Sequence, residues 1–316
     1  MVKLQGGLTV LLPLYNCSKY VETSVRSILN QTYRDFELLI IDDGSSDNSA
    51  ETVNKIKDSR IVFHKKNHTG LADTLNVGLN MSKGEWIARI DADDIAVRDR
   101  LELQTQFLYN NPDVDVISGH SVYFSGNGKV EFIVCPPSED QLIKGMLNVH
   151  NPINHSAVTF RKDKIIAGGG YDITMNCFED FELWIRLKDK LKFYILPENL
   201  AFTRIRNDSM TALASYGKIY EILRSNFKQL SNSSLNEEYM NDLEFRIEYF
   251  YGSKTEARKR RLPLNSAARI AAFMSTFLPE ESFNKLKHSR LRYRLSLDKQ
   301  EKTRLEKELA IYLNQS

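Results

Sequence analysis

A segment with three carboxylates, Asp91-Ala92-Asp93-Asp94, directly follows the apolar run WIARI. Alternating residues on an extended segment point to the same side, so Asp91 and Asp93 can face one site while Ala92 turns away. Hard oxygen ligands at this spacing suit Mg²⁺ or Mn²⁺, ions that commonly bridge carboxylates to the phosphates of a nucleotide. The alternative is an acidic surface turn, which would be electrostatically costly without a cation. The segment therefore favours a metal-diphosphate site.

A second acidic segment, DDGSSD, begins at Asp42 after the apolar run Phe36–Ile41. In an open parallel sheet, ligands bind just beyond the carboxyl ends of the strands. Asp42 and Asp43 could therefore receive the polar edge of a base or a ribose. The alternative is that these acids are solvated and that Asp47 caps the next helix.

An acidic pair, Glu179-Asp180, opens a third segment that continues with the helical pattern FELWIRLKDK. The helix dipole stabilises carboxylates in a first turn, which keeps them ionised and able to act as a base. A hydroxyl that attacks an electrophilic carbon must lose its proton to such a group. The alternative is ordinary charge at a helix N-terminus.

Two histidines and a tryptophan are further candidates. His150 and His155 flank the stretch HNPINHS before an apolar run, and either could be a third metal ligand, because imidazole suits Mn²⁺. A structural or solvent-facing histidine is the alternative for both. Trp184 could stack on an acceptor sugar, although Phe181, Trp184 and Ile185 at helical spacing are more typical of a core.

Short apolar runs alternate with helical patterns in the first part of the chain, as in a parallel sheet covered by helices. We predict strands at Leu8–Leu12, Phe36–Ile41, Ile61–Phe63, Trp86–Ile90 and Val114–Ser118. We predict helices at Tyr20–Asn30, Ser49–Lys57, Leu71–Met81 and Arg98–Tyr109.

The pattern changes after Gly119, where mixed short strands are predicted at Ala157–Phe160, Phe193–Leu196 and Ala201–Ile205. Strand signals stop near Met210. We therefore expect an α/β domain over residues 1–210, followed by a helical, basic region over residues 211–316. Within the domain the pattern divides into a first half at about 1–118 and a second half at about 119–210.

The charge of the chain is unevenly distributed. With 43 Lys and Arg residues against 41 Asp and Glu residues, the net charge of +2 is too balanced for a polycation that binds nucleic acid. Residues 251–316, however, hold 15 basic against 7 acidic residues. The basic, amphipathic sequence after Arg258-Lys259-Arg260-Arg261 could lie on an anionic membrane leaflet. The alternative is a helical appendage whose charges are solvated.

Other features narrow the class of protein. Cys17, Cys135 and Cys177 form no Cys-x-x-Cys pair, which fits a reducing compartment. No charged leader with an apolar core and no run of about 20 apolar residues is present. We therefore expect a cytoplasmic protein, soluble or at the inner leaflet of the plasma membrane. No phosphate-binding glycine loop of the Walker or GxGxxG type occurs, which excludes kinases, ATPases and dinucleotide enzymes of those classes.

Taken together, these residues resemble the inverting family 2 glycosyltransferases of GT-A fold found in bacterial capsule, O-antigen and exopolysaccharide biosynthesis. The resemblance rests on four segments, in the family's order and spacing over about the first 205 residues. They are VLLPLYNCSKYVETSVRSILNQTYRDFELLIIDDGSSDNS from Val10, NHTGLADTLNVGL from Asn67, IDADDIAVRDRLELQ from Ile90 and FEDFELWIRL from Phe178. It implies a GT-A α/β domain with a helical C-terminal extension, in which about 1–118 would be the nucleotide-sugar half and about 119–210 the acceptor half.

The resemblance implies a set of donor-binding residues. Pro13 and Tyr15 would flank the nucleobase, and Asp43 would accept a hydrogen bond from the imide N–H of uracil or thymine. Asn67 would lie on the nucleotide side of the site. Asp91 would contact the ribose or the sugar.

It also implies the catalytic and metal-binding residues. Asp93 would be the metal ligand, Asp180 the catalytic base, and Glu179 a neighbour that orients or contacts the acceptor. This chain departs from the pattern at one place: many relatives carry Arg before the Asn of the helix motif, whereas Leu75 precedes Asn76 here. A basic contact to the donor from that helix is therefore not expected.

The implied reaction is transfer of a sugar, with inversion, from a nucleotide-diphosphate donor, favoured to be a UDP-sugar. The acceptor would be a hydroxyl of a glycan or polyprenyl-linked molecule, and Mn²⁺ or Mg²⁺ the cofactor. Two other function classes also fit the carboxylates. One is a metal-dependent nucleotidyltransferase, and the other is a non-catalytic module that binds nucleotide-sugars or glycans.

Overall fold

The computed structural model describes residues 3–175, 177–206, 217–231, 294–295 and 299–314. The strands are β1 (Leu8–Leu14), β2 (Glu37–Asp42), β3 (Ile61–Lys65), β4 (Trp86–Arg89), β5 (Ile95–Ala96), β6 (Val116–Phe124), β7 (Val130–Val134), β8 (Thr159–Arg161), β9 (Phe193–Arg204) and β10 (Arg294–Leu295). The helices are α1 (Val21–Leu29), α2 (Ser49–Lys55), α3 (Leu71–Met81), α4 (Arg100–Asn110), α5 (Asp140–Met146), α6 (Lys162–Ala167), α7 (Glu179–Leu187), α9 (Gly217–Ser231) and α14 (Lys299–Leu313), with a 3-10 turn, η1, at His155–Ala157.

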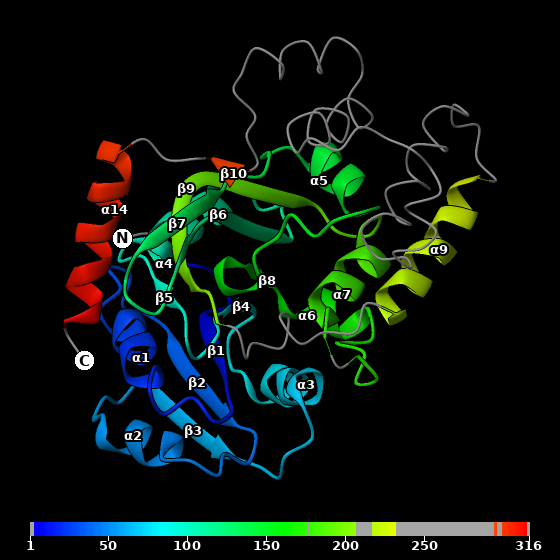
Figure 1. Ribbon diagram of the computed structural model, residues 1–316. Coiled ribbons are helices and arrows are strands. Elements are labelled where there is room, and N and C mark those ends of the chain that lie inside the picture. The colour runs from blue at the N-terminus through cyan, green and yellow to red at the C-terminus, as the bar shows by residue number, and fades with distance from the viewer. Residues whose placement is uncertain (1–2, 176, 207–216, 232–293, 296–298, 315–316) are drawn as a thin grey trace.

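The first part of the chain forms parallel strands in the order β4-β1-β2-β3 (Figure 1). Their side chains alternate between two apolar cores. Val10 and Leu38 belong to the core on the α1 face, whereas Leu11 and Leu39 belong to the core on the α3 face. Because both faces are covered, these strands read as nearly continuous apolar runs.

All but one of the elements predicted for this part are confirmed; the strand predicted at Val114–Ser118 is β6, which starts at Val116 and continues to Phe124. Strands β1 to β4 and helices α1 to α4 lie where the sequence places them, with ends shifted by no more than two residues. Leu75 and Leu79 of α3 are buried, as their helical spacing predicts. The carboxylate of Asp47 accepts a hydrogen bond from the N–H of Ser49 (3.0 Å), but the N-cap residue of α2 is Asn48, so Asp47 lies one position before the predicted cap.

The second part adds mixed strands to the same sheet, in which β8 pairs antiparallel with β4 and β6, and β9 runs parallel to β6. The two strands predicted at Phe193–Leu196 and Ala201–Ile205 are one strand, β9. Pro197 lies where the pairing with β6 shifts register, so a β-bulge replaces the predicted break. Gly119 lies at this irregularity. A glycine is required there, because a Cβ would be 2.3 Å from Leu200 Cγ.

The C-terminal helix α14 packs onto the domain that contains the sheet. Leu305 and Leu309 are buried in a third apolar core with residues of β5, β6, β7 and β9. The Tyr312 hydroxyl accepts a hydrogen bond from the N–H of Arg98 (2.8 Å). The packed-appendage alternative therefore holds for this helix. The prediction that strands stop near residue 210 is wrong, because β10 pairs antiparallel with β7; an isolated two-residue strand leaves no periodic signal.

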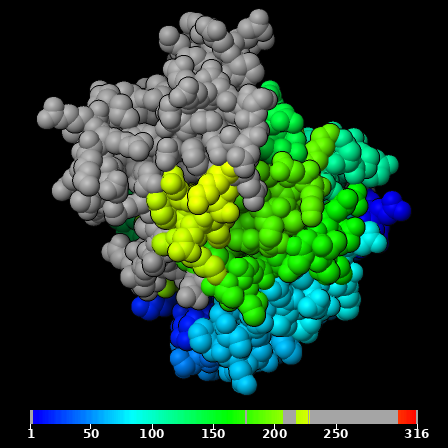
Figure 2. Space-filling view, turned by 90° about the vertical axis from the view of Figure 1, so that its right-hand side faces the viewer, coloured from blue at the N-terminus to red at the C-terminus, as the bar shows by residue number. Residues whose placement is uncertain are grey.

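Helix α9 lies against α7 on the face shown in Figure 2, where it is yellow beside the green second half of the sequence. Ile219 and Leu223 are buried in the core that also contains Leu183 of α7. The boundary predicted at residue 210 and the basic segment 258–261 lie outside the described residues. Among the helices that the structure describes, none has both the length and the apolar character needed to cross a bilayer.

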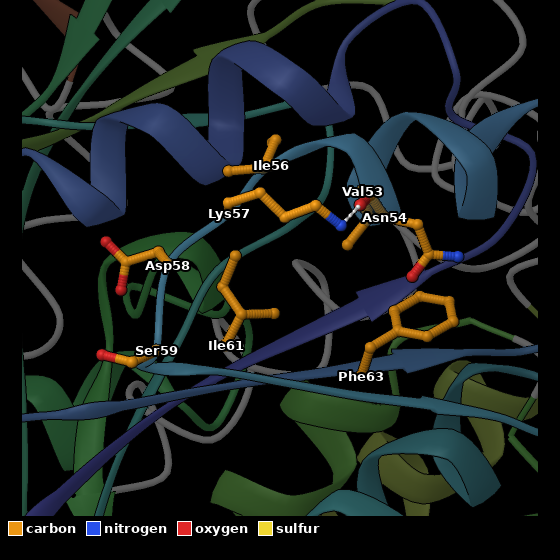
Figure 3. Close-up of a pocket in the computed structure, with 8 residues that line it drawn as sticks. All are labelled: Val53, Asn54, Ile56, Lys57, Asp58, Ser59, Ile61 and Phe63. Carbon is orange, nitrogen blue, oxygen red and sulfur yellow. Dashed lines mark hydrogen bonds between the residues drawn. The ribbon is translucent and has the colours of Figure 1, made fainter.

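A hollow of about 500 Å³ lies between α2 and the start of β3 (Figure 3). Its lining includes Ile56, Ile61 and Phe63, and the Lys57 ammonium donates to the Asn54 carbonyl across its rim (2.8 Å). None of the acidic segments singled out in the sequence lines it. It lies at the amino end of β3, the opposite edge of the parallel strands from the predicted site.

Candidate active site

The acidic segments follow neighbouring strands at one edge of the sheet. Strand β1 pairs in parallel with β2 on one side and β4 on the other. Asp42 ends β2, and Asp91 follows β4 by two residues. The carboxyl ends of neighbouring parallel strands share one edge, where open α/β sheets bind ligands. The predicted convergence of these two segments is therefore confirmed.

Asp43 is held at the start of the loop that follows β2. Its buried carboxylate accepts hydrogen bonds from the N–H groups of Thr69 (3.0 Å) and Gly70 (2.9 Å), and from the Lys66 ammonium. Burial favours the neutral acid, but these hydrogen bonds outweigh burial and lower the pKa of Asp43. The group is therefore a fixed anion that joins the β2 loop to the start of α3.

Aromatic rings lie beside this anion. Tyr15 is about half exposed and stacks on His68, with ring centroids 4.1 Å apart. His68 Nδ1 lies 2.8 Å from a carboxylate oxygen of Asp43. Asn67 is exposed on the same loop, whereas Pro13 is buried within β1. Tyr15, Asn67 and Asp43 thus surround one end of the site, and their roles toward a nucleobase stay predictions.

Asp91 lies in a network of buried groups. Its Oδ2 atom accepts hydrogen bonds from Arg89, which is almost fully buried, and from the Ser156 hydroxyl (2.8 Å). Burial works against ionisation, yet the attraction and hydrogen bond of Arg89 lower the pKa of Asp91. The Asp91 side chain is still 38% exposed, so it is an anion open to a ligand.

Asp93 and Asp94 differ in their surroundings. The Oδ2 atom of Asp93 lies 3.1 Å from Arg206 Nη1, and its side chain is 21% exposed. Asp94 is buried and accepts a hydrogen bond from the N–H of Arg204 (2.7 Å). Burial, together with the charge of Asp91, raises the pKa of both groups. Asp94 therefore has a structural role, while Asp93 lies at the surface of the site.

This carboxylate set fits a divalent metal ion. Asp93 is partly exposed and offers oxygen ligands, which Mg²⁺ and Mn²⁺ prefer. A nearby cation would favour its ionised form, which burial and Asp91 disfavour. Asp93, with Asp91 beside it, would hold the ion.

Arg100 fixes the backbone that carries these groups. Its buried guanidinium donates to the carbonyls of Ser156 (2.6 Å), Arg89 (2.8 Å) and Val158 (3.1 Å). The side chain therefore ties the end of β4 to the segment before β8. This role joins residues up to 58 positions apart, which no local sequence pattern indicates.

The acidic pair of α7 meets His155 from that same segment. His155 Nδ1 lies 3.5 Å from Glu179 Oε1 and 3.9 Å from Asp180 Oδ2. Its Nε2 atom is 3.0 Å from the hydroxyl of Tyr171. The Asp180 carboxylate also accepts a hydrogen bond from the side-chain amide of Asn151 (2.8 Å). Ser156 bonds Asp91, and its neighbour His155 faces the acidic pair of α7. These two adjacent residues therefore join Asp91 and the α7 carboxylates into one site.

The protonation states suit a general base. Burial, together with nearby Arg89, lowers the pKa of His155 to about 4, so this histidine is neutral at neutral pH. Burial raises the pKa of Glu179, and burial together with the neighbouring Glu179 raises that of Asp180. A carboxylate with a raised pKa is a stronger proton acceptor. Asp180, with 16% of its side chain exposed, can take a proton from a hydroxyl.

The remaining sequence candidates are placed as follows. His155 groups with Glu179 and Asp180, whose ligand atoms lie within 4.8 Å of one another and could also hold a metal ion. His150 is not part of that group. The acceptor role considered for Trp184 is wrong, because the side chain has no exposed surface and packs edge-on against Phe160 and Phe193 in the core.

One positioning residue, Asn76, was not predicted from the sequence. The side-chain amide of Asn76 donates to the carbonyl of Tyr171 and accepts from its N–H, both at 2.8 Å. This pair fixes the residue whose hydroxyl contacts His155. Leu75 beside it is fully buried, so the basic residue that many relatives carry before this Asn would have no solvent-facing place here.

Parallel strands followed by acidic segments after β2 and β4, with an acidic pair at the start of α7, are the arrangement of the GT-A fold. The fold is similar to two solved structures. TarS 1–349 of S. aureus in complex with UDP-GlcNAc has a TM-score of 0.61 and 18% identity, covering 89% of this chain and 83% of that one. The mannosyltransferase PcManGT of Pyrobaculum calidifontis, in complex with GDP-Man and Mn²⁺, has a TM-score of 0.57 and 17% identity, covering 99% and 87%.

Sequence comparison narrows the class to a family. Residues 9–167 match the family model of Glycosyl transferase family 2. The O-antigen biosynthesis glycosyltransferase WbnJ of Escherichia coli is 32% identical over 225 residues, which cover 68% of this chain and 87% of WbnJ. The chain belongs to glycosyl transferase family 2 and is a glycosyltransferase.

Proposed function

We propose that this glycosyltransferase moves a sugar from a nucleotide-diphosphate donor, a UDP-sugar, to an acceptor hydroxyl with inversion at the anomeric carbon. The observation that carries the proposal is the juxtaposition of Asp91 and Asp93 with Asp180, through the adjacent residues Ser156 and His155. It puts donor-side anions and a base with a raised pKa in one site.

On the donor side, Tyr15 offers a half-exposed ring to a nucleobase, and Asp43 an acceptor to its imide N–H. Uridine is favoured by the resemblance around Asp43, and the complex of TarS with UDP-GlcNAc supports the same choice. Asp93 and Asp91 would hold Mn²⁺ or Mg²⁺, which neutralises the charge that develops on the departing diphosphate.

On the acceptor side, Asp180 takes the proton of the attacking hydroxyl. Inversion requires that this hydroxyl approach from the face opposite the diphosphate, with the base next to it. Glu179 orients the acceptor from the preceding position. His155 faces both carboxylates. It stays neutral at neutral pH, so it adds no positive charge beside them.

The products released from the donor test the reaction class. Incubation with UDP-sugars and an acceptor extract should release UDP, and NMR of the product should show the opposite anomeric configuration from the donor. Release of pyrophosphate would instead indicate nucleotidyl transfer, and tight binding without turnover a binding module. Retained configuration would contradict the role of Asp180.

The metal site has its own test. Asp93→Ala should abolish the gain in UDP affinity that Mn²⁺ confers, without loss of the fold, because partly exposed carboxylates seldom carry stability. Activity that persists undiminished in excess chelator would refute the metal assignment.

We further propose that the acceptor is a polyprenyl-linked glycan of polysaccharide biosynthesis and that the enzyme binds peripherally to the inner leaflet. The name of WbnJ and the basic residues 258–261 support this. Changing Arg258, Lys259, Arg260 and Arg261 to Ser should weaken co-sedimentation with anionic vesicles, and added salt should weaken it in the wild type. This variant is a better probe than deletion of residues 257–316, which would remove the buried face of α14. Binding that ignores lipid charge would refute the membrane proposal.

A further inference from the structure

Helix α3 offers no basic side chain to the diphosphate of the proposed donor, since its sequence, LADTLNVGLNM, has no Lys or Arg. Leu75, the residue before Asn76, is buried in the core. A diphosphate that approaches Asp91 and Asp93 brings further negative charge to two carboxylates. A single divalent ion offsets only part of that charge, so a protein cation close to Asp93 would strengthen binding.

Three basic residues of the acidic segments' surroundings are already engaged. Arg89 is buried against Asp91. Lys66 is 12% exposed and bonds Asp43. The Arg204 guanidinium lies over the rings of Tyr20 and Phe124 and donates to the carbonyl of Asp93. Each would lose a structural contact by turning toward a ligand.

Arg206 is placed differently, because the contacts of its guanidinium include the predicted metal ligand itself, beside the Cys17 sulfur at 4.0 Å. It follows β9 by two residues, and its Nη1 atom lies 3.1 Å from Asp93 Oδ2. Its side chain is 22% exposed. Its guanidinium carbon lies 5.3 Å from the centre of the Tyr20 ring. The guanidinium thus lies where a metal-bound diphosphate would come.

Metal binding changes the partner that Arg206 can keep. A divalent ion on Asp93 satisfies that carboxylate and repels the guanidinium. We propose that Arg206 is a diphosphate-binding residue, which gives up Asp93 when the metal binds and then pairs with the phosphate oxygens of the donor. This inference rests on the proposed function, since it requires a metal-bound nucleotide diphosphate at Asp93.

The chemistry of arginine suits such an exchange. Its planar guanidinium can donate two parallel hydrogen bonds to phosphate oxygens, which lysine cannot do. The face of Tyr20 attracts the cation through its quadrupole while the partner changes, so the side chain stays near the site. Arg206 would thus be paired both with and without the donor.

Calorimetric titrations of wild type, Arg206→Gln and Arg206→Lys test the exchange with three probes: Mn²⁺ alone, UDP in saturating Mn²⁺, and uridine. We expect Arg206→Gln to bind Mn²⁺ alone several-fold more tightly, because the guanidinium no longer competes for Asp93. UDP affinity in Mn²⁺ should fall about 10- to 100-fold, the range of a lost charge-assisted contact, while uridine affinity stays the same. Arg206→Lys should lie between the two.

Arg26→Gln is the matched control, since Arg26 forms an exposed ion pair with Glu22 on α1 and should leave all three titrations unchanged. Unchanged UDP affinity in Arg206→Gln, with Mn²⁺-dependent binding intact in the wild type, would overturn the Arg206 assignment alone. Equal losses of UDP and uridine would also overturn it, because they would indicate a damaged site. A wild type whose UDP affinity ignores Mn²⁺ would contradict the metal site of the proposed function, and the exchange with it.

Discussion

Replacing the base, Asp180→Asn, separates chemistry from binding more sharply than any other single change at this site. Loss of a general base typically slows the chemical step 10²- to 10⁴-fold, which corresponds to about 3–5 kcal/mol of barrier. UDP affinity in Mn²⁺ should barely move, because the base is on the acceptor side. Initial rates at saturating donor, with calorimetric UDP binding on the same samples, measure both quantities.

The structure sets the expected effect on stability. Asp180 accepts hydrogen bonds from the N–H of Phe181 and the amide of Asn151, both at 2.8 Å. Asparagine has only one acceptor oxygen, so one hydrogen bond, about 1 kcal/mol, is lost. Burial and Glu179 raise the pKa of Asp180, so its ionisation in the folded protein costs stability that asparagine regains. The two effects have opposite signs.

The difference in stability between the wild type and Asp180→Asn should depend on pH. Below the ordinary pKa of an aspartate, Asp180 is protonated in both folded and unfolded states and contributes nothing. As pH rises from that value through the raised folded pKa, the wild type loses stability relative to Asp180→Asn. Paired melting curves across this range should therefore diverge in favour of the variant.

Asp163→Asn is the control, since Asp163 is an exposed acid in the first turn of α6 and should keep full activity. An Asp180→Asn enzyme that retains a tenth or more of the wild-type kcat would refute the role of Asp180 as base. A large fall in UDP affinity would refute the separation of donor and acceptor sides.

Two further predictions concern backbone and core. Gly44 has φ +74° and a Cβ there would lie 2.8 Å from the N of His68, so Gly44→Ala should cost about 2 kcal/mol or more and weaken UDP binding, whereas Gly126→Ala, with open space around it, should do neither. Leu309→Ala should destabilise by about 2–5 kcal/mol because Leu309 is fully buried, while Ile311→Ala on the exposed side of α14 should be nearly neutral in chemical unfolding. Equal effects within either pair would contradict the packing described.

The parallel half of the fold could be predicted from local pattern because each element carries its own signal. Runs such as that at β1 are apolar on both faces, and α3 repeats Leu75 and Leu79 at helical spacing. The position of the acidic segments follows from topology, since parallel strands end at one edge. These inferences need no knowledge of distant contacts.

The rest depends on pairs that are distant in the sequence. Asn76 meets Tyr171 across 95 positions, and Arg206 meets Asp93 across 113. Amphipathicity marks an apolar face but does not identify its partner, so the packing of α14 was left open. The sequence offered His155 as a third metal ligand, and only the fold shows that its ring lies 3.9 Å from Asp180 Oδ2, a residue 25 positions away.

The packing of α14 also bears on the timing of synthesis. Its Leu305 and Leu309 cover apolar residues of β5, β6 and β9 that are made much earlier. Elongation at about 5–20 residues per second would take roughly 5–20 s to pass from the end of β9 to the start of α14. During that interval Ile95, Phe124 and Phe202 lack part of their cover, so the nascent chain presents an apolar surface. A chaperone that binds such surfaces during translation should therefore engage this chain until α14 has left the ribosome.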